Sequence, residues 1–250
     1  MDRITDYGHL KGRIVDWIKS YAEKNGIRSL VIGVSGGIDS AVASTLSAET
    51  GLPVFALGMP ILQNNEQKSL SSNHLDWLVN NYANVVAHEI ELTAVFQSFS
   101  DTLRQHDFGS NNLALANSRS RLRMVTLYQV AGSTGGIVVG TGNKVEDYGV
   151  GFYTKYGDGG VDISPIADCL KTEIWDMGKE LGINQEIIDA PPTDGLWTDG
   201  RTDEQQVGLS YEEIEEAMLN EKSINRQKYL SIRKNNTHKM NPIPVCLLPK

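Results

Sequence analysis

The stretch SLVIGVSGGIDSAVASTLSAE, residues 29–49, decides the fold. Its first six residues, 29–34, are mostly apolar, which predicts a buried strand. The turn at 35–40 follows directly, and the residues after it predict a helix over 39–49. A glycine turn that joins a strand to a helix N-terminus favours anions, because backbone N–H groups and the helix dipole both point at it. We therefore expect an α/β protein with an anion site in this turn.

Apolar runs alternate with helical patterns along the first half of the chain, which is typical of βαβ units. The further strands are expected at 54–59, 84–90 and 136–141, and the helices between them at 65–80, 92–105 and 112–132. This order predicts a doubly wound parallel sheet with helices on both faces, in a single domain over 1–250. Ligands of such sheets bind beyond the carboxyl ends of the strands, so the loops that begin at Ser35, Pro60 and Thr141 should converge on one crevice.

The two ends of the chain are also expected to be helical. A helix that precedes the first strand should place one apolar side against the core, formed by Ile14, Trp17, Ile18 and Tyr21. A second helix is predicted over 210–235. Between these regions, 142–163 and 191–206 are long, polar or glycine-rich segments. We interpret the first as a functional loop and the second as a lid or a disordered excursion.

Composition excludes several classes of protein. The chain has 250 residues with 23 basic and 31 acidic side chains, and a net charge of -8 opposes general binding to nucleic acid. Its two cysteines, Cys169 and Cys246, suggest neither a disulfide framework nor a thiolate zinc site. No run approaches the roughly 20 apolar residues that span a membrane. We expect a cytoplasmic protein with small-molecule substrates and no membrane partner.

The turn at 35–40 allows more than one interpretation. Asp39 beside a bound phosphate would be repulsive unless it held a magnesium ion, which prefers oxygen ligands. The Walker pattern is absent, because no lysine precedes Ser40. Residues 33–37 also satisfy G-x-S-x-G, so Ser35 could formally be a hydrolase nucleophile with His238 downstream, although only one strand precedes it. A purely structural glycine turn, with Asp39 as an ordinary first-turn acid, is the remaining alternative.

The motif SGGIDSA resembles the pyrophosphate-binding loop of the N-type ATP pyrophosphatases, which cleave ATP to AMP and pyrophosphate. Further motifs resemble, in order, those of the NAD synthetases: NSRSRLRM (117–124), GTGNKVE (140–146), GFYTKYGDGGVDISPI (151–166), LKTEIW (170–175) and PPTDGLW (191–197). The chain is therefore identified as similar to the ammonia-dependent NAD synthetases, since no glutaminase-like region is present. This resemblance implies an adenine-nucleotide alpha-hydrolase-like fold and the ATP-dependent amidation of deamido-NAD to NAD through an adenylate.

The resemblance also implies roles for residues of the ATP site. Asp39 and Glu146 would hold Mg²⁺, and Lys171 would be a catalytic group that meets the charge of the departing pyrophosphate. Asp158 would be the second catalytic residue, accepting a proton from ammonia. The implied ATP-binding residues are Gly33, Val34, Ser35, Gly36, Gly37, Ile38, Asp39, Ser40, Thr141, Lys171 and Thr193.

The deamido-NAD contacts are implied in the same way. They are Arg121, Lys155 and Asp162, with His238 and Lys239 completing the pocket across a homodimer. Two other functions stay open at this point. One is an ATP pyrophosphatase that modifies tRNA, although a basic face is missing, and the other is a nucleotide-binding module without catalytic activity.

Overall fold

The computed structural model describes residues 4–63, 65–193 and 202–248, and its centre is a parallel sheet. Four strands pair in the order β3-β2-β1-β4, with Val31 of β1 beside Phe55 of β2 and Val138 of β4. The strands are β1 (Ser29–Gly33), β2 (Val54–Gly58), β3 (Val85–Glu89) and β4 (Gly136–Val139). The predicted order of elements and the parallel α/β sheet are confirmed.

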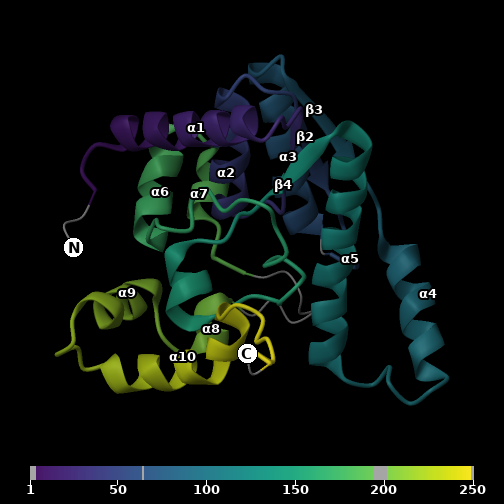
Figure 1. Cartoon of the computed structure of the whole chain (residues 1–250), viewed down its shortest axis with the longest axis vertical. Helices are drawn as coiled ribbons and strands as arrows, with labels where there is room; N and C mark the ends of the chain where they lie inside the picture. The colour runs from purple at the N-terminus through teal and green to yellow at the C-terminus, as the bar shows by residue number, and fades with distance from the viewer. Residues whose placement is uncertain (1–3, 64, 194–201, 249–250) are drawn as a thin grey trace.

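Helices cover both faces of this sheet, as predicted (Figure 1). On one face lie α1 (Tyr7–Lys24), α2 (Ile38–Glu49), α3 (Asn65–Asn81), α6 (Lys171–Glu180) and α7 (Gln185–Asp189). On the other lie α4 (Thr93–Arg104) and α5 (Asn112–Thr134). Alternate strand residues supply the two cores: Ile32 and Val139 face the first group, while Val31 and Val138 face the second.

The C-terminal part forms a third apolar cluster below the sheet layers in Figure 1. It contains the π-helix η1 (Val145–Val150), α8 (Asp203–Val207), α9 (Tyr211–Leu219) and α10 (Arg226–Met240). The single helix predicted over 210–235 is wrong, because the chain turns after α9. There Asn220 has extended backbone angles and its side chain accepts a hydrogen bond from the N–H of Lys222, a local bond that competes with the helix.

The apolar side predicted for the first helix is also partly wrong. The buried stripe of α1 consists of Ile14, Val15, Ile18 and Ala22, whereas Trp17 is 46% exposed and Tyr21 36% exposed. The two aromatic rings instead contact each other at 6.0 Å between centroids. Spacing alone placed both rings toward the core, whereas the buried side of α1 includes Val15 and Ala22 instead.

The strand order shows where the expected crevice lies. Because β2 and β4 lie on opposite sides of β1, the connections leave β1 in opposite directions, and a doubly wound sheet binds its ligands at such a point. The loops after β1 and β4 therefore meet at this edge. Ile163 pairs with Val139 and brings the chain back to the same edge after the 142–163 segment.

Among the residues that the structure describes, no helix combines the length and apolarity needed to cross a bilayer. The assignment of 1–250 to a single domain stays a prediction. Residues 194–201 of the predicted lid lie outside the described residues.

Candidate active site

The turn between β1 and α2 is held by its own serines. Ser40 Oγ donates to the Gly37 carbonyl at 2.9 Å and lies 3.0 Å from Ser35 Oγ, which accepts from the Gly37 N–H. Gly36 has a φ of 89°, a conformation that favours glycine. Ile38 and Asp39 open α2, so their N–H groups have no intrahelical acceptor and face the turn. The result is a preformed anion cradle.

The hydrolase alternative receives no support from this geometry. Within the described part of the chain, no histidine hydrogen bonds to Ser35, and His238 is exposed near the end of α10. A serine nucleophile needs a base within hydrogen-bond reach.

Three predicted residues from distant parts of the sequence meet beside the turn. Lys171 Nζ at the start of α6 donates to Glu146 Oε1 of η1 at 2.9 Å and to Asp39 Oδ2 of α2. The lysine is 2% exposed, and the two carboxylates are 17% and 18% exposed. Burial disfavours the ammonium, but the two carboxylates outweigh it and raise the pKa of Lys171 above its ordinary value. Lys171 therefore stays charged.

Asn143 links the two carboxylates and was missed by the sequence reasoning. Its amide nitrogen donates to Asp39 Oδ1 at 3.0 Å, and its amide oxygen accepts from the N–H groups of Val145 and Glu146. Asn143 is fully buried, and its amide oxygen holds the first N–H groups of η1. An asparagine within a predicted polar loop carries no distinctive signal.

The backbone next to Lys171 is fixed by two further carboxylates. Glu215 of α9 accepts from both the N–H of Thr172 at 2.9 Å and its hydroxyl at 2.8 Å. Glu173 accepts from the Leu170 N–H at 2.8 Å. Acidic groups at a helix N-terminus are favourable, so α6 begins at a defined place and directs Lys171 at the carboxylates.

Asp158 lies in the glycine-rich part of the 142–163 segment, held against α5. Its Oδ1 accepts from Ser120 Oγ at 2.6 Å and from the Thr154 N–H at 3.0 Å. A side chain at Gly157 would collide with Ser120, which explains the glycine. Asp158 stays accessible to solvent, yet surrounding protein removes enough hydration to raise the pKa of its carboxyl above the ordinary value. A carboxylate with a raised pKa suits proton transfer.

The arginines of α5 point in different directions. Arg121 is exposed, and its guanidinium donates to the carbonyl of Lys155, so the structure brings these two predicted deamido-NAD contacts together. Arg123 turns inward, where its Nε donates to the Met59 carbonyl at the carboxyl end of β2. Burial and the neighbouring Arg119 lower the pKa of Arg123 to about 10.

Two of the remaining predicted contacts, Asp162 and Lys239, have structural partners, whereas His238 is exposed. Asp162 accepts from the Val138 N–H at 2.7 Å and from the Tyr128 hydroxyl at 3.1 Å, so it holds the edge of β4. Lys239 donates to the carbonyls of Gly151 and Tyr153 within the same chain. Lys239 thus supports the loop that carries Asp158.

The two threonines predicted to bind ATP, Thr141 and Thr193, lie on different segments. Thr141 follows β4, beside the turn after β1. Thr193 follows Pro192, whose carbonyl accepts from the Asp203 N–H at the start of α8. Both positions lie on segments that border the site.

The donor set fits a magnesium ion in part. Asp39 and Glu146 converge on a single ammonium, which shows that both carboxylates can reach one cation. Within the described residues, no group of three or more His, Cys, Asp or Glu side chains forms a metal cluster. Magnesium in nucleotide sites is held by one or two carboxylates and by substrate phosphates, so two carboxylates beside an anion cradle suffice.

Comparison with known proteins decides the family. A model described as NAD synthase matches residues 10–243. An NH(3)-dependent NAD(+) synthetase from Methanosarcina acetivorans is 36% identical over 217 residues, which cover 85% of this chain and 82% of the relative. The chain belongs to the NAD synthase family. This confirms the family predicted from the sequence and the reaction class, a carbon–nitrogen ligase that uses ATP and ammonia.

Solved structures agree with this membership of the NAD synthase family. NMN synthetase from Francisella tularensis has a TM-score of 0.87 at 30% identity, with 98% of this chain and 99% of that chain covered. NH3-dependent NAD synthetase from Campylobacter jejuni, in complex with nitrate, has a TM-score of 0.76 at 24% identity, with 97% and 100% covered. The second likeness concerns the fold alone, and it confirms the adenine-nucleotide alpha-hydrolase-like fold.

Proposed function

We propose that this chain uses ATP and ammonia to convert deamido-NAD into NAD, releasing AMP and pyrophosphate. One observation carries the proposal: Asp39, Glu146 and Lys171 meet beside the anion cradle at the edge where β1 and β4 end. Relatives over most of the chain are named NH(3)-dependent NAD(+) synthetases. A nucleotide-binding module without activity would not need a buried lysine held between two carboxylates.

The first step activates the pyridine carboxylate. Its oxygen attacks the α-phosphorus of ATP, the bond to the β-phosphate oxygen breaks, and pyrophosphate leaves with the electron pair. The turn at 35–40 offers N–H groups to the pyrophosphate, and Lys171 supplies a positive charge that is already desolvated. Mg²⁺ bound by Asp39 and Glu146 would add positive charge at the phosphates.

The second step forms the amide. Ammonia attacks the acyl carbon, the bond to the AMP oxygen breaks, and the extra proton on nitrogen must be removed. Asp158 would accept this proton. Three observations support the role: its carboxyl is held in one orientation, is accessible to solvent, and has a pKa above the ordinary value. Ser120 and Thr154 orient this group from α5 and the adjacent loop.

The inner arginine is the better candidate for holding a phosphate of the acceptor. Nη2 of Arg123 is buried and has no partner among the described residues, whereas Arg121 is exposed and bonded to the carbonyl of Lys155. A buried guanidinium without a carboxylate partner favours an anion. We expect Arg123→Met to raise the KM for the acceptor about 10- to 100-fold, while Arg121→Met has a smaller effect. Equal effects would contradict this assignment.

A second acceptor is suggested by the structure from Francisella tularensis. Its name states that it makes NMN, and it matches this chain at a higher TM-score and identity than the NAD synthetase from Campylobacter jejuni. The same amidation of nicotinic acid mononucleotide would give NMN. The relatives named for NAD synthesis are more similar in sequence, at 36% identity, so deamido-NAD remains the first candidate.

The test offers both acceptors separately to the purified protein with ATP, MgCl₂ and ammonium chloride. NAD, NMN, AMP and pyrophosphate are quantified by chromatography, and kcat/KM is compared between acceptors. A higher value with deamido-NAD supports the first proposal, and a higher value with the mononucleotide supports the second. ATP cleavage without either amide would reject both and keep only the ATP pyrophosphatase chemistry.

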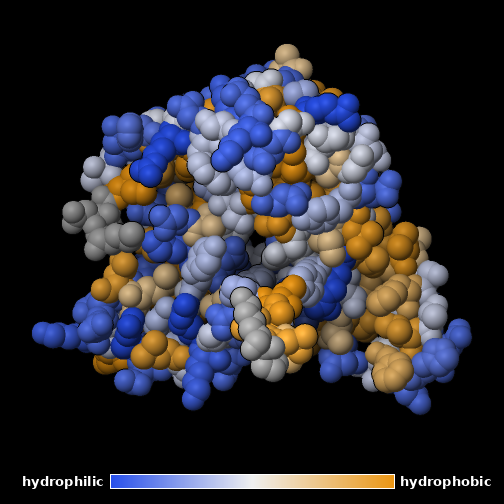
Figure 2. All heavy atoms as spheres, in the orientation of Figure 1, coloured by the Kyte–Doolittle hydropathy of each residue, from blue (hydrophilic) through white to orange (hydrophobic). Residues whose placement is uncertain are grey.

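A homodimer is part of the proposal. Figure 2 shows apolar residues gathered over α4 and α5 on one side of the molecule. Exposed members of these helices and their connection are Val95, Phe99, Phe108, Leu113 and Val125. A large exposed apolar patch marks a protein interface. Val125→Glu should shift the protein toward monomer in sedimentation velocity. The control Ile224→Glu, at a 93% exposed position outside these helices, should not. A native protein that sediments as a monomer would contradict the proposed dimer.

The location in the cytoplasm is proposed from the two free thiols. Cys169 is buried and Cys246 is exposed, and neither forms a disulfide. Free cysteines of this kind are typical of a reducing compartment.

A further inference from the structure

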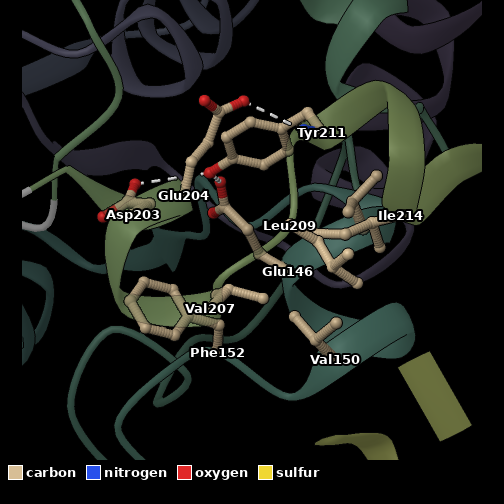
Figure 3. Close-up of a pocket in the computed structure, with 10 residues that line it drawn as sticks. Glu146, Val150, Phe152, Asp203, Glu204, Val207, Leu209, Tyr211 and Ile214 are labelled. Atoms are coloured by element: carbon tan, nitrogen blue, oxygen red, sulfur yellow. Dashed lines mark hydrogen bonds between the residues drawn. The ribbon is translucent and has the colours of Figure 1, made fainter. Parts of the chain in front are cut away.

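Tyr211 of α9 contacts two of the residues that meet beside the anion cradle. Its hydroxyl donates to Glu146 Oε1 at 2.7 Å, and its ring face lies 4.8 Å from the ammonium of Lys171. Figure 3 shows the phenol directed at the Glu146 carboxylate, with Asp203 and Glu204 around it. Tyr211 is 3% exposed, so its hydroxyl needs a partner, and Glu146 provides one.

Three contacts fix the position of Tyr211. Its N–H donates to Glu204 Oε1 at 3.0 Å, its ring meets Trp175 of α6 edge to face at 5.9 Å, and its hydroxyl is also 3.3 Å from Asp203 Oδ2. The tyrosine can therefore hold Glu146 without a rearrangement of its own.

A small cavity lies beside this contact. Its volume is about 10 Å³, enough for roughly one water molecule, and apolar side chains such as Val145, Phe152 and Ile214 line most of it. These walls offer Glu146 no other hydrogen bond on that side. The tyrosine hydroxyl is consequently the polar group that opposes rotation of the carboxylate toward the cavity.

We propose that Tyr211 is a positioning residue for the adenylation step. Its hydroxyl sets the orientation of the Glu146 carboxylate toward the metal, and its ring face holds Lys171 where both carboxylates reach it. This inference rests on the proposed function, because it assigns Tyr211 to the same reaction. A positioning role differs from a packing role, because removing the hydroxyl oxygen of Tyr211 should change metal binding while the protein still folds.

The test compares Tyr211→Phe with Tyr229→Phe. Tyr229 is a matched control, because it is 5% exposed in the same apolar cluster and its ring faces Arg226 rather than the active site. Mn²⁺ binding is measured by electron paramagnetic resonance in the presence of α,β-methylene ATP, and thermal unfolding is measured in parallel. Tyr211→Phe should weaken Mn²⁺ binding about tenfold and raise the Mg²⁺ requirement for pyrophosphate release equally, with the KM for the acceptor unchanged.

Tyr211→Leu separates the ring from the hydroxyl. It removes the ring face from Lys171 as well, so kcat at saturating Mg²⁺ should fall further than in Tyr211→Phe, which keeps the ring. If Tyr211→Phe and Tyr229→Phe bind Mn²⁺ as the native protein does, the inference is overturned and the proposed function stands. If the native protein with the nucleotide binds no Mn²⁺, the metal site of the proposed function fails, and this inference fails with it.

Discussion

Replacing Lys171 by methionine removes the ammonium between Asp39 and Glu146 and leaves two largely buried carboxylates without their cation. Removing one partner of a buried ion pair costs about 3–5 kcal/mol, because the remaining charge has lost both water and its partner. That is a large part of the roughly 5–15 kcal/mol by which domains are stable. Lys171→Met should therefore lower the free energy of unfolding by about 3–5 kcal/mol in EDTA.

Magnesium should restore part of this loss. If the two carboxylates bind the ion only in the native state, Mg²⁺ at ten times its dissociation constant adds about 1.4 kcal/mol. The assay is urea unfolding followed by circular dichroism, with and without MgCl₂. The native protein should gain less than the variant, because Lys171 already occupies the space between the carboxylates.

A surface lysine on the same helix provides the control. Lys179 forms an ion pair with Asp176 in which the two side chains are 60% and 46% exposed. Lys179→Met should change stability by no more than about 0.5 kcal/mol. A loss in Lys171→Met as small as this, or no response to magnesium, would mean that Asp39 and Glu146 do not form a shared cation site.

Two further predictions concern proton transfer and pH. Asp158→Asn should release pyrophosphate on the first turnover but form amide at least 100-fold more slowly, as measured by rapid quench; equal loss of both products would assign Asp158 to binding. His74 is 1% exposed, bonded to Ser44 and stacked on Trp77, and burial lowers its pKa from 6.5 to about 4. Its lowered pKa means that stability is present above pH 6.5 and is lost as pH falls toward 4, by about 2 kcal/mol at pH 5. His74→Gln should abolish that part of the pH dependence of urea unfolding, and an unchanged dependence would contradict the buried neutral histidine.

The sequence predicted the fold well where periodicity and turn chemistry agree. The stretch 29–49 contains a strand, a glycine turn and a helix in the order that the structure shows, and Gly36 has the positive φ that its type allows. Prediction failed where a side chain competes with the backbone: Asn220 ends α9, and the next helix, α10, begins only at Arg226. It also failed for Trp17, since the spacing of apolar residues along one helix does not say which of them the neighbouring elements cover.

Only some residues of the candidate active site could be predicted from the sequence. Asp39, Glu146 and Lys171 came from motifs, and the structure brings them together. Asn143 and Tyr211 could not be found from spacing, because their roles depend on contacts between segments separated by more than 60 residues. The sequence positions of Arg121 and Arg123 in α5 also did not show which of the two faces inward.

An oxygen-18 label shows whether the pyridine carboxylate is activated by transfer of AMP. The acceptor is prepared with both carboxylate oxygens labelled and converted with ATP, MgCl₂ and ammonium chloride, and the products are examined by mass spectrometry. We expect one labelled oxygen in AMP and none in pyrophosphate, because the carbon–oxygen bond breaks when ammonia displaces AMP. Label in inorganic phosphate together with ADP would contradict it, since the carboxylate would then have attacked the γ-phosphorus.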